Sequence, residues 1–252
     1  MNNIDIYTDF NFGGKSLSDF QGYIHTTRNL FATSVIPERD IYSETLTGIG
    51  EVYTGATIKS RKWNLDIFFD ELTNIRGIAE WLSSPIEKEF FFIGDSVKIN
   101  CICENASELE MYTDDKMRGE FTLTFVAFDP YYYNLNDKVL EFTTFSQEIV
   151  FNNDGNRESF PILEFELNGL QNVKFKLNGE NTFEIREAKD KLVLNSIYHT
   201  CRDIDSNRRK DIIGYSPAKF FYNLKLKCGE NKFQLVNGSV RKLTIHPNSR
   251  YI

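Results

Sequence analysis

Residues 63–69 read WNLDIFF, and residues 72–85 follow as LTNIRGIAEWLSSP. In the first stretch apolar and polar residues alternate, which is typical of a strand with one face packed against a core. In the second stretch apolar residues recur at steps of three and four, which predicts a helix with one apolar side. Ser83-Ser84-Pro85 ends this pattern, so the sequence predicts a strand followed by a helix that covers it.

Strand-like runs continue from this helix to Pro130. They span residues 89–93, 98–103, 108–112 and 119–128. Asp129-Pro130 breaks the last run, because proline has no backbone N–H and biases the preceding residue toward extended geometry. The first half is therefore predicted to be an antiparallel β domain with one covering helix. We place the domain boundary shortly after Pro130, dividing the chain into 1–136 and 137–252.

The second half has many turn signals between short apolar runs. Asn178-Gly179 and Asn237-Gly238 are Asn-Gly pairs, which favour tight hairpin turns because both residues tolerate positive φ. One predicted hairpin therefore spans residues 173–186, and another spans 232–246. Short, regularly spaced strands without a helical period predict a β-sandwich.

Two further features concern interactions with other chains. Residues 26–37 are rich in Ser and Thr and lack a clear period, which predicts an irregular arm that contacts neighbouring subunits. The 29 Lys and Arg residues are outnumbered by 36 Asp and Glu, giving a formal net charge of −7. No net positive field therefore favours binding to nucleic acid.

Other composition data limit the protein class. Aromatic residues make up 14% of the chain, and such residues favour sheets. The apolar runs fall far short of the roughly 18 residues of a membrane span, and the N-terminus lacks a secretory pattern. We therefore expect a protein made in the cytoplasm, with no membrane partner. Its four cysteines are expected to be reduced thiols.

Candidate chemical groups are few. The imidazoles of His25, His199 and His246 accompany no Gly-x-Ser-x-Gly elbow, so we expect no enzyme activity, no catalytic residue and no cofactor. The best metal candidate is His199, Cys201 and Asp203, because period-two spacing would place them on one strand face. The competing interpretation is an edge strand that leads into a polar loop.

Arg202, Arg208 and Arg209 crowd the same stretch and would oppose a cation, so no metal is expected. Sugar binding by the second half would need an exposed aromatic platform, for which Tyr198, Tyr215 or Tyr222 could serve. Ordinary core or rim tyrosines are the alternative.

Several motifs follow one another in the order found in a known family. In the first half they are Gly48-Ile49-Gly50-Glu51-Val52 before a long strand, Ile78-Ala79-Glu80-Trp81-Leu82 on the helix, a hairpin, and the strand from Gly119 that runs into Asp129-Pro130-Tyr131. In the second half they are Ile149-Val150-Phe151-Asn152-Asn153-Asp154-Gly155, Phe160-Pro161-Ile162-Leu163-Glu164-Phe165, Gly229-Glu230-Asn231 and Pro247-Asn248-Ser249-Arg250-Tyr251-Ile252. With this order the chain resembles the distal tail proteins of siphophages, especially those that infect Gram-positive hosts.

The resemblance implies a structural protein of the virion tail tip, assembled in the host cytoplasm. Residues 1–136 would assemble into a hexameric ring, and residues 137–252 would form a galectin-like β-sandwich. The ring would join the tail-tube protein to the tail-associated fibre or lysin protein, with receptor-binding proteins as further partners and DNA only as a passing cargo. The alternative is a carbohydrate-binding module that attaches the tail to host cell-wall polysaccharide.

Overall fold

The computed structural model describes residues 8–24, 37–71, 74–112, 118–145, 148–179, 181–204, 207, 209, 212–215 and 224–252. The chain forms two compact units: unit 1 runs to Tyr132 and includes Ile252, and unit 2 runs from Tyr133 to Tyr251. Strands dominate both units, and α1 is the one α-helix in the described ranges, which confirms the predicted mainly β class. The functional division at residue 136 into a ring-forming and a galectin-like domain stays a prediction.

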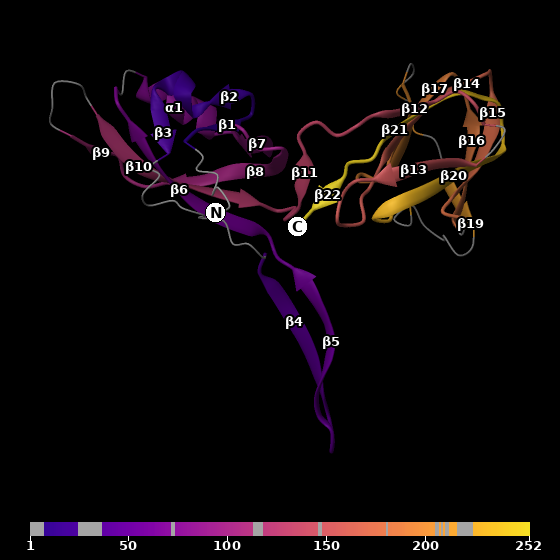
Figure 1. Cartoon of the computed structure of the whole chain (residues 1–252), viewed down its shortest axis with the longest axis horizontal. Coiled ribbons are helices and arrows are strands. Elements are labelled where there is room, and N and C mark those ends of the chain that lie inside the picture. The colour runs from indigo at the N-terminus through magenta and orange to yellow at the C-terminus, as the bar shows by residue number, and fades with distance from the viewer. Residues whose placement is uncertain are drawn as a thin grey trace, which may run out of the picture. The chain divides into compact units, whose positions relative to one another are not determined.

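Unit 1 is built on an antiparallel sheet in the order β2-β1-β7-β8-β10-β6-β3, with β9 also paired to β10 (Figure 1). These strands are β1 (Phe10–Phe12), β2 (Lys15–Ser16), β3 (Gly22–Ile24), β6 (Arg61–Phe69), β7 (Lys88–Phe92), β8 (Val97–Ala106), β9 (Glu110–Met111) and β10 (Gly119–Ala127). The 3-10 helix η1 (Leu17–Phe20) lies between β2 and β3.

The predicted strand over 63–69 is the centre of this sheet. In β6 every second side chain from Arg61 to Phe69 is buried, as the alternation of apolar residues predicts. Strand β10 pairs with it over its whole length, from Gly119 opposite Phe69 to Ala127 opposite Arg61. The two strands therefore supply one continuous buried face to the core of unit 1.

Helix α1 (Ile75–Leu82) covers this core. Its first turn is capped by the Asn74 side chain, which accepts a hydrogen bond from the Gly77 N–H at 2.9 Å. The buried indole of Trp81 donates to the Phe12 carbonyl at 2.7 Å and stacks on Phe20 with ring centroids 4.9 Å apart. The predicted helix and its end before Pro85 are confirmed, and one aromatic side chain fixes the helix to β1.

A second, two-stranded sheet of unit 1 consists of β4 (Arg39–Leu46) and β5 (Gly50–Ile58), which we call the arm (Figure 1). The two strands pair from Arg39 opposite Ile58 to Leu46 opposite Gly50. The motif order predicts Gly48–Val52 ahead of a long strand, whereas residues 50–52 already belong to β5. The irregular segment predicted at residues 26–37 is distinct from this arm, and its residues 26–36 lie outside the described residues.

Unit 2 consists of two five-stranded antiparallel sheets. The first has the order β12-β21-β14-β17-β18 and contains β12 (Leu140–Phe142), β14 (Ile162–Leu167), β17 (Lys191–Asn195), β18 (Thr200–Asp203) and β21 (Val240–His246). The second has the order β13-β20-β15-β16-β19 and contains β13 (Ile149–Asn153), β15 (Gln171–Leu177), β16 (Asn181–Ala188), β19 (Ile212–Tyr215) and β20 (Gly229–Asn237). The short strands β11 (Tyr132–Asn134) and β22 (Arg250–Tyr251) complete the chain.

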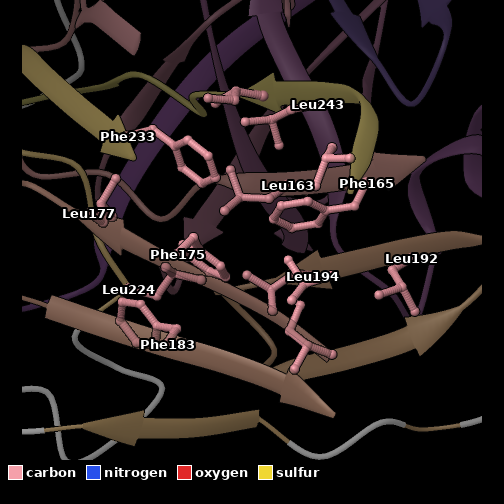
Figure 2. Close-up of a cluster of buried hydrophobic side chains, with 14 of the residues drawn as sticks. Leu163, Phe165, Phe175, Leu177, Phe183, Leu192, Leu194, Leu224, Phe233 and Leu243 are labelled. Atoms are coloured by element: carbon pink, nitrogen blue, oxygen red, sulfur yellow. The ribbon is translucent and has the colours of Figure 1, made fainter. Parts of the chain in front are cut away.

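One hydrophobic core lies between these two sheets (Figure 2). Phe165 of the first sheet contacts Phe175 of the second with ring centroids 5.5 Å apart. Phe175 also stacks on Phe183 and Phe233 at 5.4 and 5.3 Å. Because both sheets bury their inward residues against each other, unit 2 is a β-sandwich.

The two predicted hairpins of the second half have different outcomes. Strands β15 and β16 pair across Asn178-Gly179, which confirms the first. The second prediction is wrong, because β20 pairs with β13 and β15 while β21 pairs with β12 and β14. Asn237-Gly238 therefore carries the chain from one sheet to the other, a step that needs the same positive φ at Gly238 (108°) as a hairpin turn.

Candidate interaction surfaces

The structure separates the predicted metal candidates. Strand β18 begins at Thr200, so His199 lies in the preceding turn with a φ of 49° and is exposed. Cys201 and Asp203 lie on the buried side of β18, and Cys201 belongs to the sandwich core. In the described residues no group of three or more His, Cys, Asp or Glu side chains could hold a metal ion. Period-two spacing holds only within a strand, and this strand starts one residue too late.

The thiols of β8 are poor nucleophiles. Burial is the main cause that raises the pKa of Cys101 strongly, and the neighbouring Cys103 and Glu87 add to it. Burial also raises the pKa of Cys103 to about 11. Both thiols are therefore almost entirely protonated at neutral pH, and they react slowly because the thiolate is the reactive form.

No helix of the described chain is long and apolar enough to cross a membrane.

The arm is the first surface that stands out. None of its side chains is buried, although Ile41 and Tyr53 are large apolar groups that are 73% and 66% exposed. Its root is held by an ion pair between Lys59 and Asp40 at 2.8 Å, which raises the pKa of Lys59. A two-stranded ribbon without a core is only marginally stable in water. Exposed apolar side chains of this kind are typical of a surface that another chain covers.

The arm also exposes apolar groups near its tip. Leu46 is 44% exposed and Ile49 is 75% exposed, and the Ile49 N–H donates to the Leu46 carbonyl at 3.0 Å across the turn. Exposed apolar side chains therefore extend along the ribbon from Ile41 to the turn and back to Tyr53.

Sequence reasoning missed the arm for a physical reason. Apolar alternation arises when one face of a strand is buried, and neither face of β4 or β5 is buried within this chain. The available signal was different: Ile41, Tyr42, Thr45, Val52 and Tyr53 are β-branched or aromatic residues on either side of Gly48. Such composition favours strands without indicating a core face.

A groove in unit 1 is the second surface. It has a volume of about 440 Å³ and lies between α1 and the C-terminal half of β8. The helix side contributes Ile75, Ile78, Ala79, Leu82 and Ser83, and the sheet side contributes Cys103, Glu104, Asn105, Ala106, Ser107, Leu109 and Phe121. Most of these side chains are apolar, so the groove is suited to apolar side chains rather than to a charged ligand.

Comparisons with known proteins agree with this architecture. A scan of protein-family models and a search of curated proteins find no match. Among solved structures, the chain is similar to the Dit protein of phage SPP1, described as a paradigm of the hub adsorption apparatus in phages that infect Gram-positive bacteria. That match has 13% identity and a TM-score of 0.71, and it covers 98% of this chain and 100% of the other.

Two structures of the phage P2 baseplate in its activated conformation, one with Ca and one with Sr, also match. Their TM-scores are 0.52 and 0.51 at 9% and 10% identity, with 96% and 94% of this chain and 98% and 97% of the other chains covered. These likenesses extend over both units. The chain therefore has the fold of the SPP1 Dit hub protein.

Proposed function

We propose that this protein is a structural component of a phage or phage-like tail tip. In this role it forms a hexameric hub that joins the tail tube to the tail-associated fibre or lysin protein. The observation that carries the proposal is the arm, because it places large apolar side chains in water with no core of their own. A fold shared with a hub protein over nearly the whole chain supports the same role.

The function works through interfaces, not turnover. The likeness to a phage hub protein and to phage baseplate chains supports this proposal. Unit 1 is the ring-forming part, since it bears the arm, and unit 2 is a galectin-like sandwich. Each copy carries a formal charge of −7, so a ring of them repels DNA that passes through instead of retaining it. Assembly takes place in the host cytoplasm.

Negative-stain microscopy of the purified full chain tests the hub. At tens of micromolar we expect closed rings with six-fold symmetry, alone or as back-to-back pairs. A protein that stays a monomer at that concentration contradicts the proposal.

Carbohydrate binding is the second candidate function. Tyr198 at the β17–β18 turn is 75% exposed, and its N–H donates to the Asn195 side chain at 3.1 Å, which fixes the turn. An exposed ring on a fixed turn can stack on a sugar. Pull-down of the full chain with host cell-wall polysaccharide, lost in Tyr198→Ala, would favour this candidate, and equal retention of both proteins would exclude it.

A further inference from the structure

We infer that the arm of one copy docks in the groove between α1 and β8 of the next copy, with its tip residues Leu46 and Ile49 in the groove. This inference rests on the proposed ring and names the two surfaces that close it. It starts from a match between the exposed apolar side chains of the arm and an apolar groove of the same chain that could accept them from a second copy.

The groove offers apolar walls on a firm frame. On the α1 side of the groove, the side chain of Ile75 is 45% exposed. On the sheet side, Cys103 and Phe121 are half-buried. The helix itself is anchored by Trp81, whose indole donates to the Phe12 carbonyl. The hollow of about 440 Å³ lies between anchored elements, so it persists without a ligand. Its apolar walls are removed from water only when side chains fill it.

Strand β8 also offers backbone groups at this groove. Strand β7 pairs with β8 only as far as Cys101, whereas β8 continues to Ala106 and pairs there with β10 on its other side. Strand β11 is a third partner of β8, and the groove residues Glu104, Asn105 and Ala106 lie in the part of β8 beyond its pairing with β7. An extended segment that enters an apolar groove beside a strand can add backbone hydrogen bonds to its side-chain contacts.

The arm has the form and size of such a segment. Its strands contain 8 and 9 residues, close to the roughly 20 residues that one side of a standard interface uses. Among the described residues, each of these two strands pairs only with the other. The arm can therefore supply apolar side chains to the groove and backbone groups beside β8.

The occupant is a second copy because of how rings close. The arm and the groove are different surfaces of the same chain, so a contact between them is head to tail. Head-to-tail contacts form a closed ring when the rotation between copies divides a full turn. A contact between two arms would instead be symmetric and would stop at a dimer.

Native Cys103 provides the test, because it lines the groove. In full-length protein carrying Cys228→Ser, Ile49→Cys should form a disulfide with Cys103 of another copy under copper-phenanthroline oxidation, giving a ladder up to the hexamer on a denaturing gel. Adding Cys103→Ser should abolish the ladder. A cysteine placed in unit 2 by Val150→Cys, at a side chain 51% exposed, should give no ladder with Cys103.

A groove-blocking pair gives an independent readout. Ala79→Arg puts a long cation into the groove from an exposed helix position, and arginine is a good helix former. Microscopy should show loss of rings, while Glu80→Arg, next to it on the same helix, should leave rings intact. Rings that survive Ala79→Arg and yield no Ile49–Cys103 ladder overturn the inference but leave the hub standing. A wild-type monomer overturns both.

Discussion

Two β-hairpins of this chain differ in what their side chains touch. In β15–β16, Val173, Phe175 and Ile185 are completely buried and form part of the sandwich core. In the arm, no side chain is buried. The backbone pairing is similar, so strand pairing alone does not require a core. The first hairpin is held by burial within its own chain, and the second becomes buried only by contact with another.

The largest expected effect is the loss of stability caused by a core substitution in the β15–β16 hairpin. Phe175→Ala removes a ring that contacts Phe165, Phe183 and Phe233, and should lower the free energy of unfolding of unit 2 by about 3–5 kcal/mol. Urea denaturation followed by circular dichroism measures it. Trp63 and Trp81 are both in unit 1, so the tryptophan fluorescence transition should stay in place. A simultaneous shift of both transitions would show that the two units do not unfold independently.

Thiol reactivity tests how accessible the groove is, because Cys103 in the groove is half-buried whereas Cys228 is exposed. Burial raises the pKa of Cys103 to about 11, so its thiolate fraction at pH 7 is about a hundredfold below that of an ordinary thiol. Labelling with Ellman's reagent should be fast at exposed Cys228 and about a hundredfold slower at Cys103. The slow rate should rise about tenfold per pH unit from pH 7 to 9.

Comparison with Cys103→Ser identifies the slow phase. Loss of the fast phase in that variant, with the slow phase kept, would show that the groove thiol is open and that burial does not suppress it.

A glycine in unit 2 should have the next largest effect. A Cβ on Gly155 would lie 2.5 Å from the Arg250 carbonyl oxygen and 2.6 Å from its nitrogen, so Gly155→Ala should cost about 1–3 kcal/mol in unfolding free energy. In the arm, a Cβ on Gly48 would meet nothing within 4 Å, but the φ of Gly48 is +83°, so Gly48→Ala should strain the turn of the arm and leave the midpoint of unit 2 unchanged. Circular dichroism should show a lower midpoint for unit 2 in the first variant only. Equal midpoints for Gly155→Ala and wild type would mean that this close approach relaxes at little cost.

The comparison also explains which parts of the fold the sequence could predict. Strand β6, helix α1 and the β15–β16 hairpin were predictable, because each buries one face and so repeats apolar residues at its own period. The arm lacks that period for the opposite reason. Asn237-Gly238 was misread because a local turn preference does not say which sheet the next strand joins. The interaction surfaces therefore lay where the core signal is weakest.

The three weak metal candidates do not share a strand face, for a local reason. His199, Cys201 and Asp203 share a face only if the strand includes all three, and β18 begins after His199. Strand boundaries depend on pairing with β17, which ends opposite Thr200 at Asn195. Residues 199–203 alone therefore do not show where β18 begins, because its first residue is set by pairing with β17.

The smallest expected effect on stability belongs to the arm and tests the central claim, that its apolar side chains serve assembly and not folding. Ile41→Ser with Tyr53→Ser changes two side chains that are 73% and 66% exposed, so unfolding free energy should change by no more than about 0.5 kcal/mol per site. Sedimentation equilibrium of the wild-type chain should give six times 29.3 kDa, and that of the double variant a single copy, with equal urea midpoints under monomeric conditions. A double variant that keeps the wild-type mass, or a wild-type chain that sediments as one copy, would contradict the account.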